Sequence, residues 1–257
     1  STMYKTAITL GKREEAEEFA IRREKLNKLI HQTFYRADEG IYSTGSQLDM
    51  CYPMLVGVVP DSLYNKVKEN VVAMTEEKYK GHIAVGLVGV PILTEWAVRN
   101  KQVDFFYQMM KKRDYPGYLY MIDHGATATW EYWSGERSRV HNCYNGIGTW
   151  FYQAVGGIRL DEANSGYRHF YVDPQTPNGV TWAKVTKESP YGTIAVNWKL
   201  KDDNQLNLQL TVPAGTTATV CIPNNAVSCK KNKKKVSVKE QTVDVEAGHY
   251  DFLFNLK

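Results

Sequence analysis

The 257 residues predict an α+β protein of two domains, a helical half followed by an antiparallel β-sandwich. Two observations lead to this fold class. Apolar residues recur with the period of a helix through the first part of the chain, whereas from Tyr167 onward they alternate with polar ones. The length suffices for two cores. We expect a helical domain over 1–160 and a β domain over 161–257, with the boundary near 158–166.

The helical domain is predicted to contain helices at 4–10, 12–35, 60–81, 82–100, 101–117 and 145–157. The second helix has an apolar stripe formed by Ala16, Phe19, Ala20, Leu26, Leu29, Ile30 and Phe34. The fourth is apolar nearly all round, as expected of an inner helix. Such alternation of amphipathic and apolar helices predicts about three helix pairs, half of a closed six-hairpin barrel. The first helix is short, and we expect further chain before Ser1 in the natural protein.

The β domain is predicted from short segments in which apolar and polar residues alternate, at 192–200, 205–213, 235–238, 242–245 and 249–256. Turn residues separate these segments at Asp202-Asp203, Ala214-Gly215, Asn224-Asn225 and Ala247-Gly248. Several strands at this spacing are typical of an antiparallel sandwich.

Composition excludes some classes of partner. The formal net charge of +4 is too small to indicate a nucleic-acid-binding protein. The longest apolar run, 84–93, is too short for a membrane span. The lysine-rich segment 230–239 is interpreted as a charged hairpin that protects a sheet edge. A polyanion-binding patch is the alternative, and the absence of interleaved aromatic residues argues against it.

The cysteines, Cys51, Cys143, Cys221 and Cys229, lack the paired short spacing of a zinc site. We expect four free thiols, with a Cys221–Cys229 disulfide across a hairpin as the less favoured alternative. No metal or cofactor is implied, and the cellular compartment stays open.

The segment 123–135, DHGATATWEYWSG, brings two tryptophans beside a carboxylate. Trp130, Glu131 and Trp133 do not share a face of any regular element, so the segment predicts an irregular loop that presents aromatic faces beside an acid. The loops at 39–53 and 77–89 are also rich in Tyr, His and Gly. Aromatic platforms with scattered carboxylates and amides are typical of sugar sites, because a pyranose offers C–H faces and hydroxyls. For any single aromatic residue, the alternative to a role in sugar binding is that its ring fills the protein core.

The motifs YMIDHGATATWEYWSG and HNCYNGIGTWFYQAVGGI resemble the signature of the bacterial α-L-rhamnosidases of glycoside hydrolase family 78. The segments LTVPAGTTATVCIP and VEAGHYDFLF resemble that family's closing β-sandwich. The resemblance covers essentially the whole chain. It implies part of an (α/α)6 helical barrel followed by the sandwich, and removal of terminal α-L-rhamnose with inversion by one carboxylic acid and one carboxylate.

The resemblance also assigns residues. The family's general base corresponds to Glu131, and Trp130 would help to shape the sugar pocket. His141 matches the histidine expected to hydrogen-bond the rhamnose, with Asn142 as a support. Asp123 and His124 match further motif positions, where loop architecture and substrate contact are equally good explanations.

Three departures from the family pattern stand out. Ala128 replaces the second threonine of the first motif, and Cys143 replaces the second histidine of the next. The Asp-Glu-Arg-Leu-Gly-Trp-like segment that carries the family's general acid has no counterpart, since the Asp-Glu pairs at 38–39 and 161–162 lack its flanking residues. We therefore expect this chain alone to be inactive. An incomplete barrel also leaves apolar helices that a second copy could cover.

Two alternatives remain open. One is a non-catalytic carbohydrate-binding relic of such an enzyme. The other is an (α/α)6 hydrolase that acts on glucosides or uronides. The uronide version is weakened by the low density of Arg and Lys near the motif.

Overall fold

The computed structural model describes residues 2–201 and 204–257. These residues form two compact units. The first comprises 2–100 and 105–146, and the second comprises 101–104, 147–201 and 204–257. The sequence instead predicts a boundary at 160. Residues 147–157 join the second unit because their backbone binds its strands: Trp198 Nε1 donates to the carbonyl of Val155 at 2.7 Å, and the amide of Asp173 donates to that of Gly157 at 2.9 Å.

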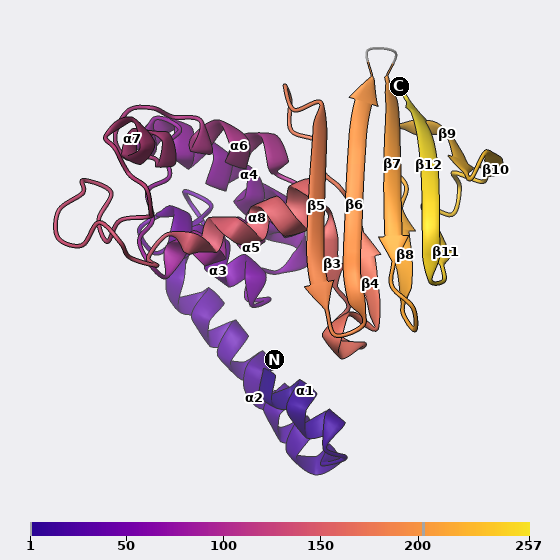
Figure 1. The fold of residues 1–257 in the computed structure, drawn as a ribbon. Coiled ribbons are helices and arrows are strands. Elements are labelled where there is room, and N and C mark those ends of the chain that lie inside the picture. The colour runs from indigo at the N-terminus through magenta and orange to yellow at the C-terminus, as the bar shows by residue number, and fades with distance from the viewer. Residues whose placement is uncertain (1, 202–203) are drawn as a thin grey trace. The chain divides into compact units, whose positions relative to one another are not determined.

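The first unit is helical, as predicted (Figure 1). Its helices are α1 (Thr2–Thr9), α2 (Arg13–Phe34), α3 (Gln47–Leu55), α4 (Asp61–Tyr79), α5 (Gly89–Arg99), α6 (Val103–Met110), whose first two residues belong to the second unit, and α7 (Tyr118–Asp123). α3 packs against both α4 and α5. A two-stranded ribbon, β1 (Tyr35–Arg36) and β2 (Ile41–Tyr42), lies between α2 and α3.

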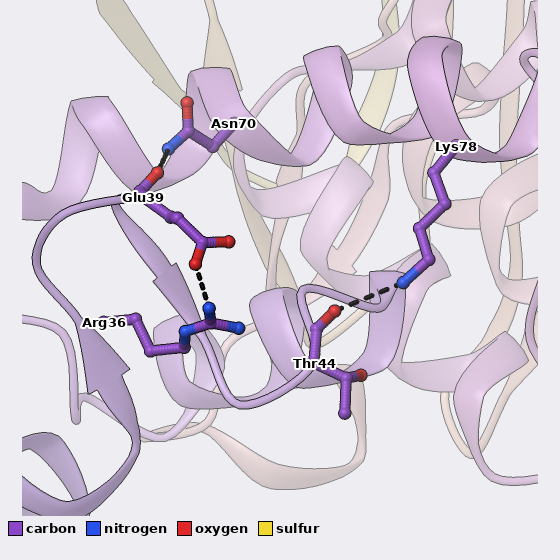
Figure 2. Close-up of polar contacts among 5 residues, drawn as sticks. All are labelled: Arg36, Glu39, Thr44, Asn70 and Lys78. Atoms are coloured by element: carbon purple, nitrogen blue, oxygen red, sulfur yellow. Dashed lines mark hydrogen bonds and ion pairs between the residues drawn. The ribbon is translucent and has the colours of Figure 1, made fainter.

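Polar contacts fasten this ribbon and the loop after it to α4 (Figure 2). Asn70 Nδ2 donates to the carbonyl of Glu39 at 3.3 Å, and Lys78 Nζ donates to that of Thr44 at 3.2 Å. Arg36 pairs with the Glu39 carboxylate within the ribbon. At the start of α3, the Ser46 hydroxyl accepts the Asp49 amide at 3.1 Å, which caps the helix. The loop 39–46 therefore has a defined path into α3.

Three helix predictions need correction. The helix predicted at 82–100 begins at Gly89, because buried Gln47 binds the backbone of 82–84 in an irregular conformation. The helix predicted at 101–117 ends at Met110, well before Pro116. The sequence predicts loops at 39–53 and 117–135, but α3 begins within the first at Gln47 and α7 lies within the second.

The predicted apolar stripe on α2 does not become a buried face. Ala16 is 2% exposed, but Leu26, Leu29 and Phe34 are 45%, 56% and 49% exposed. Phe19, Ala20 and Ile30 of the same stripe are half-buried, so the described residues cover this side of the helix only in part.

The second unit contains two sheets (Figure 1). The six-stranded sheet has the order β10-β9-β12-β7-β6-β5, and the four-stranded sheet has the order β11-β8-β4-β3. Their strands are β3 (Ile158–Leu160), β4 (His169–Val172), β5 (Trp182–Ser189), β6 (Gly192–Lys201), β7 (Gln205–Val212), β8 (Thr217–Cys221), β9 (Ala226–Lys231), β10 (Lys234–Val236), β11 (Thr242–Val245) and β12 (Gly248–Leu256).

The alternation that predicted the sandwich also places its core. Ile194, Val196 and Trp198 on β6 are at most 1% exposed. The strand predicted at 235–238 ends at Val236, and β4 pairs with β8 in parallel, unlike the other strand pairs described here. The lysine-rich segment forms the predicted hairpin, β9–β10, at the sheet edge. The predicted turn at Asp202-Asp203 lies outside the described residues.

Ahead of β3 the chain forms a 3₁₀ turn η1 (Asn145–Ile147), a short helix α8 (Gly148–Trp150) and a π-helical turn η2 (Phe151–Val155). A further 3₁₀ turn, η3 (Ser165–Tyr167), precedes β4. All four cysteines are free, as predicted. No helix in the described part of the chain is long and apolar enough to span a membrane.

Candidate active site

The segment 124–144 is an irregular loop that folds back on itself, which confirms the loop predicted at 123–135 except for Asp123, the last residue of α7. The His141 amide donates to the carbonyl of Thr129 at 2.8 Å, and the Glu131 amide donates to that of Ser138 at 2.9 Å. The Thr129 hydroxyl adds a contact of 2.5 Å to the carbonyl of His141. Glu131 and His141, which lie ten positions apart in the sequence, are thereby held on facing arms of one loop.

Glu131 has a half-buried side chain with one backbone partner. Its Oε2 accepts the Ser138 amide at 3.3 Å, and its side chain is 26% exposed. Arg137 Nη1 lies 3.8 Å from Oε1, but the Arg137 side chain is 70% exposed, so this ion pair contributes little. The carboxylate is thus oriented by the loop and keeps lone pairs for a further partner.

Cys143 interacts with both His141 and Glu131. Its amide donates to Nδ1 of His141 at 3.1 Å, so the neutral imidazole carries its proton on Nε2 and can donate from there. Burial and the nearby Glu131 carboxylate raise the pKa of the Cys143 thiol. The loop therefore brings together a carboxylate acceptor, an imidazole donor and a neutral thiol.

Both tryptophans of the loop point into the protein. Trp130 is 2% exposed, with the guanidinium of Arg139 5.1 Å from its ring centre. Trp133 is 8% exposed, stacks on Tyr144 at 3.8 Å and donates from Nε1 to the carbonyl of Val85 at 3.0 Å. The expectation that the loop presents the faces of Trp130 and Trp133 is wrong, because both rings are buried beneath it, whereas Tyr132 between them is 44% exposed. The pocket-shaping role of Trp130 stays a prediction.

Asp123 and His124 lie at the end of α7. The Asp123 carboxylate accepts Nη1 of Arg113 at 2.6 Å. His124 donates from Nδ1 to the carbonyl of Tyr120 at 2.8 Å and packs on that ring. Asn142 is exposed next to His141. Substrate contacts of these residues stay predictions, and their described contacts are those of loop architecture.

Sequence reasoning missed the residues that shape the loop. Gly135 has a φ of +78°, and a Cβ there would lie 2.7 Å from the Trp130 ring. Gln47, 2% exposed, accepts the Ala84 amide at 2.8 Å and donates to the carbonyl of His82 at 2.9 Å, which fixes the segment that Trp133 binds. A glycine beside a tryptophan-rich motif is a usable signal, whereas the role of Gln47 depends on contacts between distant segments.

Within residues 2–201 and 204–257, no group of three His, Cys, Asp or Glu side chains could hold a metal ion. What the loop offers is proton acceptance by Glu131 and hydrogen-bond donation by His141.

Residues 1–155 match the family described as the bacterial α-L-rhamnosidase 6 hairpin glycosidase domain. Residues 157–237 match the bacterial α-L-rhamnosidase C-terminal domain. An α-L-rhamnosidase of Formosa agariphila is 29% identical over 96% of this chain. One of Streptomyces avermitilis is 30% identical over 75% of it. The chain spans 29% and 19% of the lengths of these two relatives.

Solved structures share the fold. The α-L-rhamnosidase of Dictyoglumus thermophilum matches 99% of this chain with a TM-score of 0.89 at 20% identity, over 30% of its own length. The S. avermitilis α-L-rhamnosidase complexed with L-rhamnose matches 97% of this chain with a TM-score of 0.84 at 24% identity, over 25% of its length. At these identities the likeness establishes the fold alone.

Proposed function

Because this chain belongs to the bacterial α-L-rhamnosidase six-hairpin glycosidase family, we propose that it is part of an inverting hydrolase that releases terminal α-L-rhamnose. Glu131 is its general base. The observation that supports the proposal is the loop 129–143, whose backbone hydrogen bonds hold Glu131 and His141 on facing arms. These two residues occupy the positions of the rhamnosidase motif predicted to act on the sugar.

The geometry suits activation of water. A general base needs an ionised oxygen with a free lone pair in a fixed direction. The Ser138 amide fixes one oxygen of Glu131 and leaves lone pairs open. His141, with Nδ1 occupied by the Cys143 amide, would donate from Nε2 to a rhamnose hydroxyl. The sugar is then held while Glu131 takes a proton from the attacking water.

We propose that the general acid lies outside these 257 residues, in the part of the relatives that this chain does not span. An inverting pair places its two carboxyl groups about 6.5–9.5 Å apart, with the sugar and the water between them. Loss of general acid catalysis costs about 10²–10⁴-fold in rate. The chain alone would therefore bind rhamnose at most and hydrolyse it barely or not at all.

The test compares this chain with a version extended upstream to the length of its relatives. Both are assayed for nitrophenol release from p-nitrophenyl α-L-rhamnoside, with the α-glucoside and β-glucuronide as controls. We expect turnover only in the extended protein and only of the rhamnoside, with β-L-rhamnose as the first anomer seen by NMR. Initial release of the α-anomer, or preference for a control sugar, would contradict the proposal.

A carbohydrate-binding relic is the second candidate, and Cys143 is the observation that favours it. This thiol is 7% exposed beside Glu131, where the rhamnosidase motif has a histidine. Rhamnose binding without turnover in the extended protein would select the relic over the hydrolase.

A further inference from the structure

The outer face of the six-stranded sheet, opposite the sandwich core, has a groove of about 790 Å³, and none of its lining residues belongs to the proposed catalytic loop. It crosses strands β5, β6, β7, β12 and β9, which lie side by side in Figure 1. Strand registers place its side chains in rows. Trp182 opposes Lys199, Lys199 opposes Asn207, Asn207 opposes Leu253, and Leu253 opposes Lys230.

The neighbouring row is a ladder of amides that ends on a carboxylate. Asn197 Nδ2 donates to Oε1 of Gln209 at 3.1 Å, and Gln209 Nε2 donates to Oδ1 of Asp251 at 3.2 Å. Each amide nitrogen has two hydrogens and each ladder contact uses one, so donors remain. The ladder orders the floor of the groove and leaves it able to bind hydroxyl groups.

An aromatic platform stands at one end of this floor. Trp182 is the first residue of β5 and is 64% exposed, whereas the other tryptophans of the described chain are at most 8% exposed. Tryptophan is highly buried on average, so Trp182 is the exception among the described tryptophans of this chain. An indole bordered by amides is suited to stacking against the C–H face of a pyranose.

The charge around the groove selects among saccharides. Lys199, Lys230 and Lys233 line it together with one carboxylate, that of Asp251. All three lysines are exposed, and none forms an ion pair with a carboxylate in residues 2–201 and 204–257. Two of them come from the β9–β10 hairpin, so this hairpin contributes cations to the sheet face as well as protecting its edge. Three ammonium groups against one carboxylate favour an anionic ligand.

We propose that this groove binds an acidic polysaccharide, a chain of pyranoses that carry uronate carboxylates. Trp182 stacks on one ring, Asn207 and Gln209 bind hydroxyls, and the three lysines bind carboxylates through charge-assisted hydrogen bonds. This second saccharide site is independent of the rhamnoside chemistry proposed for Glu131. It would hold polymeric substrate on the β domain.

The test is affinity electrophoresis and calorimetry of the 257-residue chain with polygalacturonate, with neutral dextran and a DNA oligonucleotide for comparison. We expect binding to polygalacturonate that weakens with salt and is at least about tenfold tighter than binding to dextran. Trp182→Ala should weaken it about tenfold, the size of one aromatic contact. Lys230→Gln with Lys233→Gln should remove the preference for polygalacturonate over dextran.

Matched controls lie on the same unit outside the groove. Tyr191→Ala removes another exposed ring, and Lys234→Gln removes an exposed lysine of the same hairpin whose cross-strand partner is Lys231 and not the groove residue Lys230; both should bind as the parent does. Thermal unfolding of every variant should match the parent, because all these side chains are exposed. Absence of binding, DNA binding as tight as polygalacturonate binding, or full affinity in Trp182→Ala would each overturn the proposal. None of these results depends on rhamnosidase activity.

Discussion

In the six-stranded sheet, neighbouring strands are held by long runs of backbone hydrogen bonds. Any apolar residue at every second position of a strand therefore reaches the core. In the Glu131 loop, few backbone pairs exist, and single side chains such as Thr129 and Trp133 bind distant backbone atoms. The conformation of the sheet is therefore determined by the alternation of apolar and polar residues, whereas the conformation of the loop is determined by individual side chains. The expected consequence is that sheet stability depends on buried volume, whereas loop geometry depends on a few irreplaceable contacts.

The largest effect should come from the sheet core. Trp198→Ala removes an indole that is 1% exposed and leaves the Val155 carbonyl without its donor, so we expect a loss of about 3–5 kcal/mol in the free energy of unfolding. Urea denaturation measures it. Trp182→Ala, an exposed tryptophan of the same sheet, should change stability by less than about 0.5 kcal/mol. Equal losses in the two variants would refute the dependence on buried volume.

A smaller effect is expected where the loop needs a glycine. Gly135→Ala forces a Cβ to 2.7 Å from the Trp130 ring at a φ of +78°, and should cost about 2 kcal/mol and alter near-UV circular dichroism. Gly125→Ala is its control, since φ there is +82° but no atom lies within 4 Å of the new Cβ. That variant should cost about 1 kcal/mol and leave the spectrum unchanged. An unchanged Trp130 signal in Gly135→Ala would show that the ring is not held by this contact.

Next in size is the loop closure. Thr129→Val keeps the shape and removes the hydroxyl at 2.5 Å from the carbonyl of His141, so we expect a loss of about 1 kcal/mol, readable by urea denaturation. The exposed Thr127, two residues earlier, supplies the control Thr127→Val, which should be neutral. A neutral Thr129→Val would mean that the two backbone pairs suffice to close the loop.

The smallest effect concerns charge. The Glu131 carboxylate helps to raise the pKa of the Cys143 thiol, so Glu131→Gln should lower that pKa and speed alkylation of Cys143 by iodoacetamide at pH 8.5. The sign follows from removing a negative charge that disfavours the thiolate. Mass spectrometry of the Cys143 peptide measures the rate, with Glu136→Gln in the same loop as the control. Equal alkylation rates in the two variants would show that the Glu131 carboxylate does not raise the pKa of the Cys143 thiol.

The same contrast explains what the sequence could predict. The strands β6, β7, β11 and β12 follow from alternation alone, because one face of each is buried. The parallel pairing of β4 with β8 joins segments that are far apart in the chain, and no local pattern encodes it. Periodicity correctly placed α4, and it failed at 82–88, where Gln47 replaces helical hydrogen bonds with its own amide.

For the site, the motif around Glu131 predicted an irregular loop and placed Glu131 and His141 as candidates. It could not predict the direction of the two indoles, because Trp133 is turned inward by the Val85 carbonyl and by Tyr144. It also could not predict that Cys143, treated as a departure from the family motif, would orient His141 through its backbone amide.

The role of general base proposed for Glu131 is best tested by kcat on p-nitrophenyl α-L-rhamnoside for Glu131→Gln and Glu136→Gln in the protein extended upstream. We expect kcat to fall about 10²–10⁴-fold in Glu131→Gln with unchanged thermal unfolding, and to stay at the parental value in Glu136→Gln. Parental turnover in Glu131→Gln would contradict this role.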